Sequence, residues 1–329
     1  MSQPPTHHPI APCHANKTRG NSDEQPPVFS VSIGNTHTSV VGWHSSRQPA
    51  VSWKTDSLPR NMPELCRSIL SHTPPQACVI ISGVVPKLKT QLIKLFKNKF
   101  SPIYIFRKNL LPQIEIIPQP PECVGDDRIA AALGALSIDS TVPWIVVDAG
   151  TALTSNVITP GQNGKLPRFE GGLIIPGETL SLKALAAHTA QLPHIEKKSS
   201  DRSEMSDFNF IGKNTEDAMR WGVAVAQRAA LLAIIEGQAS AAGEHVRIVI
   251  TGGGAVELIG SRIMKATAEK SKRQDIFRCG SVFSCARTNK VQFKFGPPSS
   301  RKIEFHDGLV HLGLFTTLAE CCNSRRRRE

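Results

Sequence analysis

The residues WIVVDAGTALTSNVI, numbered 144–158, give the clearest indication of the fold. This stretch begins with a continuous apolar run that ends in Asp148, turns through a Gly-Thr pair, and then becomes apolar again. Apolar runs of this length are typical of buried strands, and a glycine between two of them indicates a tight turn. The stretch therefore predicts a strand over Trp144–Asp148, a turn, and a returning strand over Ala152–Ile158.

The same unit occurs once more, closer to the N-terminus. Val28–Ile33 is a short apolar-rich run, and a Gly-Asn-Thr turn separates it from a second run over Thr38–Trp43. SIGNTHTS, residues 32–39, can be laid over DAGTALTS, residues 148–155, with Gly, Thr and Ser at matching places. An echo of eight residues can arise by chance. Interpreted as a repeat, it indicates two similar domains that face a shared cleft.

Strands and helices alternate along the rest of the chain, which is typical of an α/β architecture. Proline at a first helical position, acidic residues in a first turn and a glycine just past a last turn mark the helix ends. The further strands expected are Ala77–Ser82, Ile103–Phe106, Ile114–Ile117 and Arg247–Thr251, and the helices expected begin at Pro86 or span Arg128–Ile138, Thr215–Glu236 and Val256–Lys270.

A chain of 329 residues fits two domains. We expect an N-terminal domain over 28–140 and a C-terminal domain over 141–320. Residues 1–27 are rich in Pro, His, Asn and Ser and carry no signal-peptide pattern, so we expect a disordered extension. A basic insertion is expected near 268–302, and a basic tail over 321–329.

Lys and Arg total 39 against 27 Asp and Glu, a formal net charge of +12. Nucleic-acid binding is one interpretation, but aromatic residues for base stacking make up only 5% of the chain. The charge also suits a protein that handles anionic nucleotides. The eight cysteines form no CxxC pair, which is typical of a cytoplasmic protein with reduced thiols. No uninterrupted apolar run reaches the roughly 18 residues of a membrane helix.

Both glycine turns are rich in groups that can bind phosphate. Glycine lets the backbone approach an anion closely, while adjacent N–H groups and hydroxyls donate to its oxygens. Two ordinary hairpins are the alternative, but two matched turns favour phosphate clamping. The chain has no Walker A sequence. The residues that supply these groups are Gly34, Asn35, Thr36 and Thr38 in the first turn, and Gly150, Thr151 and Thr154 in the second.

Three further features could carry chemistry or be purely structural. Gly125–Arg128 (GDDR) precedes an Ala-rich helix, where a carboxylate could orient a substrate hydroxyl and Arg could bind an anion. An acidic helix start with a salt bridge is the alternative. Asp148, at the end of a buried strand, could hold a cation or cap the turn. The glycines 252–254 could border an adenosine or form a flexible turn, and they do not match a dinucleotide fingerprint.

Taken together, the motifs resemble those of the type III pantothenate kinases. The most specific combination is VVDAGTALT with GGLIIPG and TAQLP, and the others are SIGNTHTSVVGW, ISGVVP, VGDDR, GKNTEDAMRWGV and VITGGGAVEL. The resemblance implies two duplicated ribonuclease H-like (actin-like ATPase) domains with ATP in the cleft between them. It also implies phosphorylation of pantothenate in coenzyme A biosynthesis by a homodimer that uses Mg²⁺ and a monovalent cation, K⁺ or NH₄⁺.

The resemblance also implies roles for individual residues. Asp127 would be the catalytic base and Asp148 the ligand of the monovalent cation. Pantothenate would contact Gly125, Asp126, Asp127, Arg128 and, across the dimer interface, Thr215. We further hypothesise that Arg128 anchors the pantothenate carboxylate. The implied ATP-binding residues are Ser32, Ile33, Gly34, Asn35, Thr36, His37, Thr38, Ser39, Thr151, Gly252 and Gly253.

The sequence departs from the family pattern in four places. Ser32 stands where an Asp normally begins the first phosphate loop and helps to organise the hydration shell of Mg²⁺. Asn156 replaces a usual Asp, Pro118 replaces a frequent aromatic residue, and the stretch 268–302 is longer and more basic than expected. Ser32 and Asn156 favour, as a second hypothesis, a catalytically weakened relative with a binding or regulatory role. The basic segments favour, as a third, a nucleic-acid-associated regulator.

Overall fold

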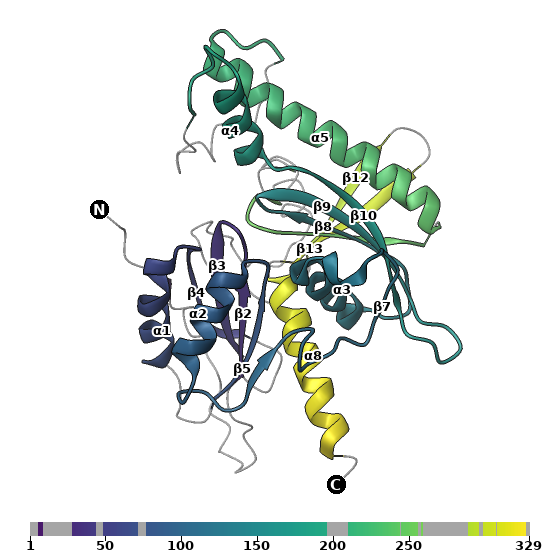
Figure 1. Ribbon diagram of the computed structural model, residues 1–329. Coiled ribbons are helices and arrows are strands. Elements are labelled where there is room, and N and C mark those ends of the chain that lie inside the picture. Colours follow the sequence, from purple (N-terminus) through teal and green to yellow (C-terminus); the bar gives the residue numbers. More distant parts are fainter. Residues whose placement is uncertain are drawn as a thin grey trace, which may run out of the picture.

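The computed structural model describes residues 6–8, 28–43, 49–71, 77–195, 210–243, 245–255, 258, 289–295, 299–306 and 308–326. Two sheets dominate the described residues (Figure 1). The first has the order β1-β4-β3-β2-β5-β6, and the second has the order β12-β13-β11-β8-β9-β10-β7. The strands of the first sheet are β1 (Thr6–His8), β2 (Val28–Ile33), β3 (His37–Trp43), β4 (Pro49–Asp56), β5 (Cys78–Gly83) and β6 (Ile103–Ile105). Those of the second are β7 (Glu115–Ile116), β8 (Trp144–Ala149), β9 (Ala152–Thr159), β10 (Arg168–Pro176), β11 (Arg247–Thr251), β12 (Asn289–Phe295) and β13 (Ser299–Phe305).

The two sheets share one topology. In the first, β2 pairs antiparallel with β3, β3 antiparallel with β4, β2 parallel with β5, and β5 parallel with β6. In the second, β8, β9, β10, β11 and β13 repeat these four pairings in the same order and directions. The eight-residue echo is therefore part of a duplicated five-stranded unit. The predicted fold class, two duplicated ribonuclease H-like α/β domains, is confirmed.

Helices form the outer and middle layers. They are α1 (Met62–Leu70), α2 (Pro86–Phe96), α3 (Asp126–Ile138), α4 (Glu178–His188), α5 (Thr215–Ala242) and α8 (Leu309–Arg326). One apolar core joins α1 and α2 to the first sheet, and another joins α5 to the second. A third core joins α3 and α8 to residues of both sheets, so these two helices form the layer between the sheets (Figure 1).

The close packing of α3 on α8 explains why α3 lacks a polar face. Its residues from Ile129 to Leu136 are all buried, which is the pattern of a helix covered on all sides. Small residues let the two backbones approach, because a Cβ on Gly134 or Gly313 would overlap a carbonyl oxygen of the other helix. This contact fixes the first turn of α3 between the two sheets, where the candidate site lies.

Several boundaries differ from the sequence-based expectation. Thr6–His8 pairs with β4, so this part of the expected disordered extension is a strand, because the edge of β4 offers it backbone partners. The other residues of 1–27 lie outside the described residues. α5 continues past Gly237 to Ala242, and its C-cap is Gly243, whose φ of 100° suits only glycine. α3 starts at Asp126, two residues before the expected start.

Several contacts cross the expected boundary between the two domains at residue 140. β7, from the N-terminal half, pairs with β10 of the second sheet, and α8 packs against α3 and the first sheet. β13 is the fifth strand of the duplicated unit, so the expected insertion over 268–302 includes a core strand; residues 268–288 lie outside the described residues. The expected tail over 321–329 begins inside α8. The expected helix Val256–Lys270 lies, apart from Leu258, outside the described residues.

Candidate active site

The two glycine turns meet. Thr36 Oγ1, from the turn between β2 and β3, lies 2.7 Å from Thr151 Oγ1, from the turn between β8 and β9. Each turn is closed by its glycine, since Gly34 N donates to His37 O (2.9 Å) and Gly150 N donates to Ala152 O (3.1 Å). The duplicated topology therefore brings two solvent-exposed, hydroxyl-bearing bends together at one point between the sheets.

The side chains of the predicted segment Ser32–Ser39 point in different directions. Ile33 is buried in the core beneath α1 and α2, so only its backbone could bind ATP. Thr38 Oγ1 hydrogen-bonds Ser57 Oγ (2.9 Å), which in turn donates to Gly34 O (2.6 Å). Ser39 Oγ hydrogen-bonds His311 Nε2 of α8 (2.8 Å). Thr38 and Ser39 thus shape the turn, while Asn35, Thr36 and His37 remain exposed.

The GDDR segment forms the first turn of α3, and its two carboxylates are used differently. Asp126 ion-pairs with Lys89 Nζ (3.3 Å) and Arg107 Nη1 (3.5 Å). This carboxylate, expected among the pantothenate contacts, is engaged by two cations of the N-terminal half. Asp127 instead accepts a hydrogen bond from Arg128 N (2.8 Å). A Cβ on Gly125 would lie 2.5 Å from Asp127 Oδ1, so glycine leaves room for this carboxylate.

Arg128 crosses from α3 to the second sheet. Its Nε and Nη2 donate to the same atom, Asn156 Oδ1 of β9, at 2.8 and 2.5 Å. Its guanidinium also lies 5.4 Å from the ring centroid of Phe169. Asn156 is only 1% exposed. The residue that replaces the usual Asp therefore still orients the guanidinium, but it leaves the positive charge of Arg128 without a carboxylate at this position.

Asp127 and Asp148 are close enough to influence each other. Burial raises the pKa of Asp127, while the hydrogen bond from the Arg128 backbone lowers it. Burial, helped by the charge of Asp127, raises the pKa of Asp148 to about 7. Thr154 lies directly opposite Asp148 in the β8–β9 pair, and its buried Oγ1 has no hydrogen-bond partner among the described residues. A partly buried carboxylate beside a hydroxyl oxygen that has no hydrogen-bond partner suits a cation.

The glycine run after β11 lies against the second turn. Gly254 N donates to Ala149 O (2.9 Å), and a Cβ on Gly252, whose φ is 96°, would overlap Asp148 Oδ1. Glycine at 252 is therefore required both by the backbone conformation and by the closeness of Asp148. Gly252 and Gly253 lie where the C-terminal ends of β8 and β11 meet, beside the Thr36–Thr151 contact.

Thr215 is the one predicted site residue that the fold places elsewhere. It begins α5, where Asn214 caps the helix by accepting from Asp217 N (2.8 Å). Figure 1 shows this end of α5 beside α4 and away from α3. A single copy of the chain therefore does not bring Thr215 to Asp127.

Some partners were not predicted from the sequence. Ser57 and His311 hold the first turn, and neither lies in a recognisable motif. Asn156 was noted only as a departure from a pattern. Its position two residues after Thr154 on one strand places both side chains on the same face of the sheet, and this spacing could have identified it. Pro118, which replaces a frequent aromatic residue, packs against Gly171 of β10: its Cγ lies 3.1 Å from the position that a Cβ on Gly171 would take.

The family model and the similar sequences identify one family. A family model described as type III pantothenate kinase matches residues 28–237. A type III pantothenate kinase of Chlorobaculum parvum is 31% identical over 235 residues, which cover 68% of this chain and 82% of that protein. The enzyme of the same name from Desulfotalea psychrophila is 30% identical over 249 residues, covering 70% and 88%. MreB 5 of Spiroplasma citri bound to AMPPNP aligns with a TM-score of 0.47 at 10% identity, over 93% of this chain and 100% of that one.

Proposed function

The chain belongs to the type III pantothenate kinase family, and from this premise we propose that it phosphorylates pantothenate with ATP, giving 4′-phosphopantothenate for coenzyme A biosynthesis. The observation that carries the proposal is the contact between the two glycine turns, Thr36 Oγ1 to Thr151 Oγ1, beside the start of α3. Phosphoryl transfer needs mainly positioning and electrostatic stabilisation, and the arrangement of these groups suits both.

The triphosphate lies across the two turns. The hydroxyls of Thr36 and Thr151 and the backbone N–H groups of the turns donate to its oxygens, and Gly252 and Gly253 border the adenosine. A bound polyphosphate would separate the two threonine hydroxyls, each of which would then donate to phosphate instead of to the other. The two domains would therefore bind the same triphosphate together.

Asp127 receives the proton of the pantothenate hydroxyl as that oxygen forms its bond to the γ-phosphorus and the bond to the β–γ bridging oxygen breaks. Burial raises the pKa of this carboxyl, which makes it a stronger base than an exposed aspartate. Arg128, oriented by Asn156, binds the pantothenate carboxylate with a charge that no carboxylate at position 156 neutralises. The replacement of the usual Asp at 156 is thus compatible with catalysis.

Asp148 and Thr154 would hold a monovalent cation, K⁺ or NH₄⁺, because a partly buried carboxylate with a raised pKa gains from a neighbouring positive charge. Mg²⁺ would accompany ATP and neutralise charge on the phosphates. Ser32 offers it a hydroxyl where a carboxylate is usual, so the phosphates and water would supply most of its ligands.

We also propose that two copies associate and that the enzyme is cytoplasmic. Several large apolar side chains on β10, α4 and α5 are exposed in the single chain, namely Leu173, Ile174, Leu180 and Leu232. α5 is long and apolar enough to cross a membrane by length and composition, although charged residues interrupt it and one face packs on the second sheet. A second copy would cover the exposed apolar side chains of β10, α4 and α5, and it could bring its Thr215 to the pantothenate site.

The test is a coupled assay of ADP formation with the purified chain, pantothenate, ATP and Mg²⁺, with K⁺ present or replaced by Na⁺. Pantothenate-dependent turnover that K⁺ stimulates supports the proposal. ATP binding without pantothenate-dependent turnover would favour the weakened relative instead. Light scattering during gel filtration measures the mass of the particle, and a monomer at micromolar concentration would contradict the dimer.

A further inference from the structure

The implied ATP-binding residues have no permanent positive charge. They are serine, threonine, glycine, asparagine and isoleucine residues together with His37. Burial lowers the pKa of His37, and Lys54 lowers it further, whereas Asp56 raises it, so this ring is largely neutral at pH 7. A polyphosphate placed between the two turns therefore lacks a cationic partner within that set. Phosphate-binding sites in proteins commonly include a lysine or arginine.

Lys54 lies in the strand next to the first turn. In the register of the sheet, Lys54 of β4 is opposite Ser39 of β3, and Ser39 is opposite Ser32 of β2. Directly opposed residues lie on the same face of a sheet, so Lys54, Ser39 and Ser32 form one row across three strands. Ser39 bonds His311 of α8, which shows that this row faces the layer between the two sheets.

The ammonium group of Lys54 reaches the other half of the molecule. A Cβ placed on Gly253 would lie 3.7 Å from Lys54 Nζ. Gly253 follows β11 of the second sheet, next to the turn that carries Thr151. Lys54 also influences the pKa of His37, which belongs to the first turn. One half-buried lysine thus lies beside both glycine-rich segments that are expected to hold the nucleotide.

We propose that Lys54 binds the polyphosphate of ATP and is a further substrate-binding residue of this kinase, an inference that rests on the proposed function. Its ammonium would donate to the β- and γ-phosphate oxygens and offset the negative charge that moves onto the bridging oxygen as the bond to the γ-phosphorus breaks. Lys54 remains protonated throughout, since the proton of the acceptor hydroxyl passes to Asp127.

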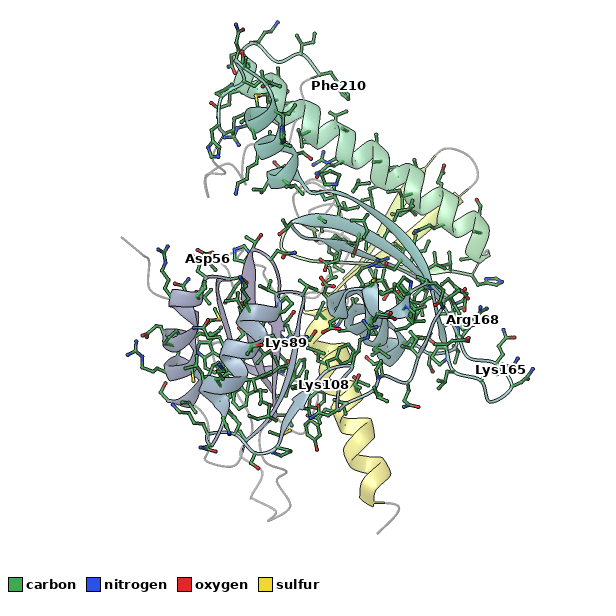
Figure 2. All side chains as sticks on the ribbon, in the orientation of Figure 1. Asp56, Lys89, Lys108, Lys165, Arg168 and Phe210 are labelled. Carbon is green, nitrogen blue, oxygen red and sulfur yellow. The ribbon has the colours of Figure 1, made fainter. Side chains whose placement is uncertain are left out.

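The direct test measures nucleotide binding by calorimetry, without pantothenate, for the wild type and for Lys54→Ala, Lys54→Arg and Lys165→Ala. Lys165 is an exposed lysine in the loop between β9 and β10, far from the turns in Figure 2, and it controls for the loss of one charge. We expect Lys54→Ala to weaken ATP and ADP binding by about 10- to 100-fold, the loss typical of one charge-assisted hydrogen bond. Adenosine binding should not change.

Lys54→Arg should recover most of the lost affinity, and Lys165→Ala should bind ATP like the wild type. If Lys54 only joins the two halves, adenosine and ATP affinities will fall together, and that result would overturn the inference. Unchanged ATP affinity in Lys54→Ala would overturn it as well.

Turnover of pantothenate separates this inference from the proposed function. A wild-type protein that binds ATP through Lys54 but does not phosphorylate pantothenate would leave the inference intact and remove the proposed function. If the wild type phosphorylates pantothenate and Lys54→Ala binds ATP as tightly as the wild type, the proposed function stands and the inference about Lys54 fails. A wild type that binds no ATP would remove both. Circular dichroism of each variant checks that the fold is retained.

Discussion

Asp127 and Asp126 are adjacent carboxylates with different partners in the structure, which makes them a matched pair for mutation. Asp127→Asn removes the proposed base but keeps the shape of the side chain. Because a positioned general base typically contributes about 10²- to 10⁴-fold, kcat should fall by that factor. Asp126→Asn breaks the ion pairs with Lys89 and Arg107, and kcat should change little.

The free energy of unfolding should fall in Asp126→Asn and not in Asp127→Asn, the reverse of the effect on kcat. Burial raises the pKa of Asp127, and a carboxyl whose folded pKa is raised costs stability as the pH rises above its unfolded value. Asp127→Asn should therefore be at least as stable as the wild type above about pH 4 and equal to it below. Asp126→Asn should lose about 1–3 kcal/mol, because it leaves two partly buried cations without their carboxylate.

The assays are steady-state kinetics with saturating substrates and urea unfolding at pH 7 and pH 3.5. The expected outcome is an inactive, stable Asp127→Asn and an active, destabilised Asp126→Asn. Wild-type turnover in Asp127→Asn would refute the proposed role of that carboxylate as the base. An Asp126→Asn protein that is inactive but as stable as the wild type would show that Asp126, and not Asp127, carries the chemistry.

Three further predictions concern neighbouring groups. Asn156→Ala removes the acceptor of two Arg128 N–H groups, so the KM for pantothenate should rise about tenfold or more with a smaller change in kcat, as measured by varying pantothenate at saturating ATP. His311 is buried, and its pKa is lowered to about 4, so the folded protein holds this ring neutral whereas the unfolded chain protonates it below pH 6.5. The free energy of unfolding should therefore be constant with respect to this group above pH 6.5 and fall by about 3 kcal/mol towards pH 4. Chemical denaturation across this range should show that loss, and His311→Gln should reduce it. Arg247→Ala leaves the 3%-exposed Glu304 without its cation and should cost about 3–5 kcal/mol in the same unfolding assay.

The duplicated fold was largely predictable, because strand pattern and glycine turns are local properties of the sequence. The eight-residue echo identified the two units, and apolar runs identified β2, β5, β8 and β11. The pairings of β7 with β10 and of α8 with α3 were not predictable. Both join segments far apart in the chain, and a two-residue strand or a C-terminal helix gives no local sign of its partner.

The candidate site was predictable in its residue types but not in its contacts. Motif spacing indicated both turns and the GDDR segment, and the resemblance implied that Asp127 is the base. The ion pairs of Asp126 were not predictable, because Lys89 and Arg107 lie on other elements. Asn156 looked like a lost carboxylate in the sequence. In the structure it is the acceptor that orients Arg128, a role for which an amide oxygen suffices.

Phosphoryl transfer to pantothenate is tested by following the γ-phosphoryl group of ATP. The purified chain is incubated with pantothenate and ATP labelled at the γ-phosphate, in K⁺ and Mg²⁺, and the products are separated by chromatography. The two turns around a triphosphate, with Asp127 facing the acceptor alcohol, predict that the label appears in 4′-phosphopantothenate in step with ADP formation. Label that stays in ATP, or appears only as inorganic phosphate, would contradict the proposed activity.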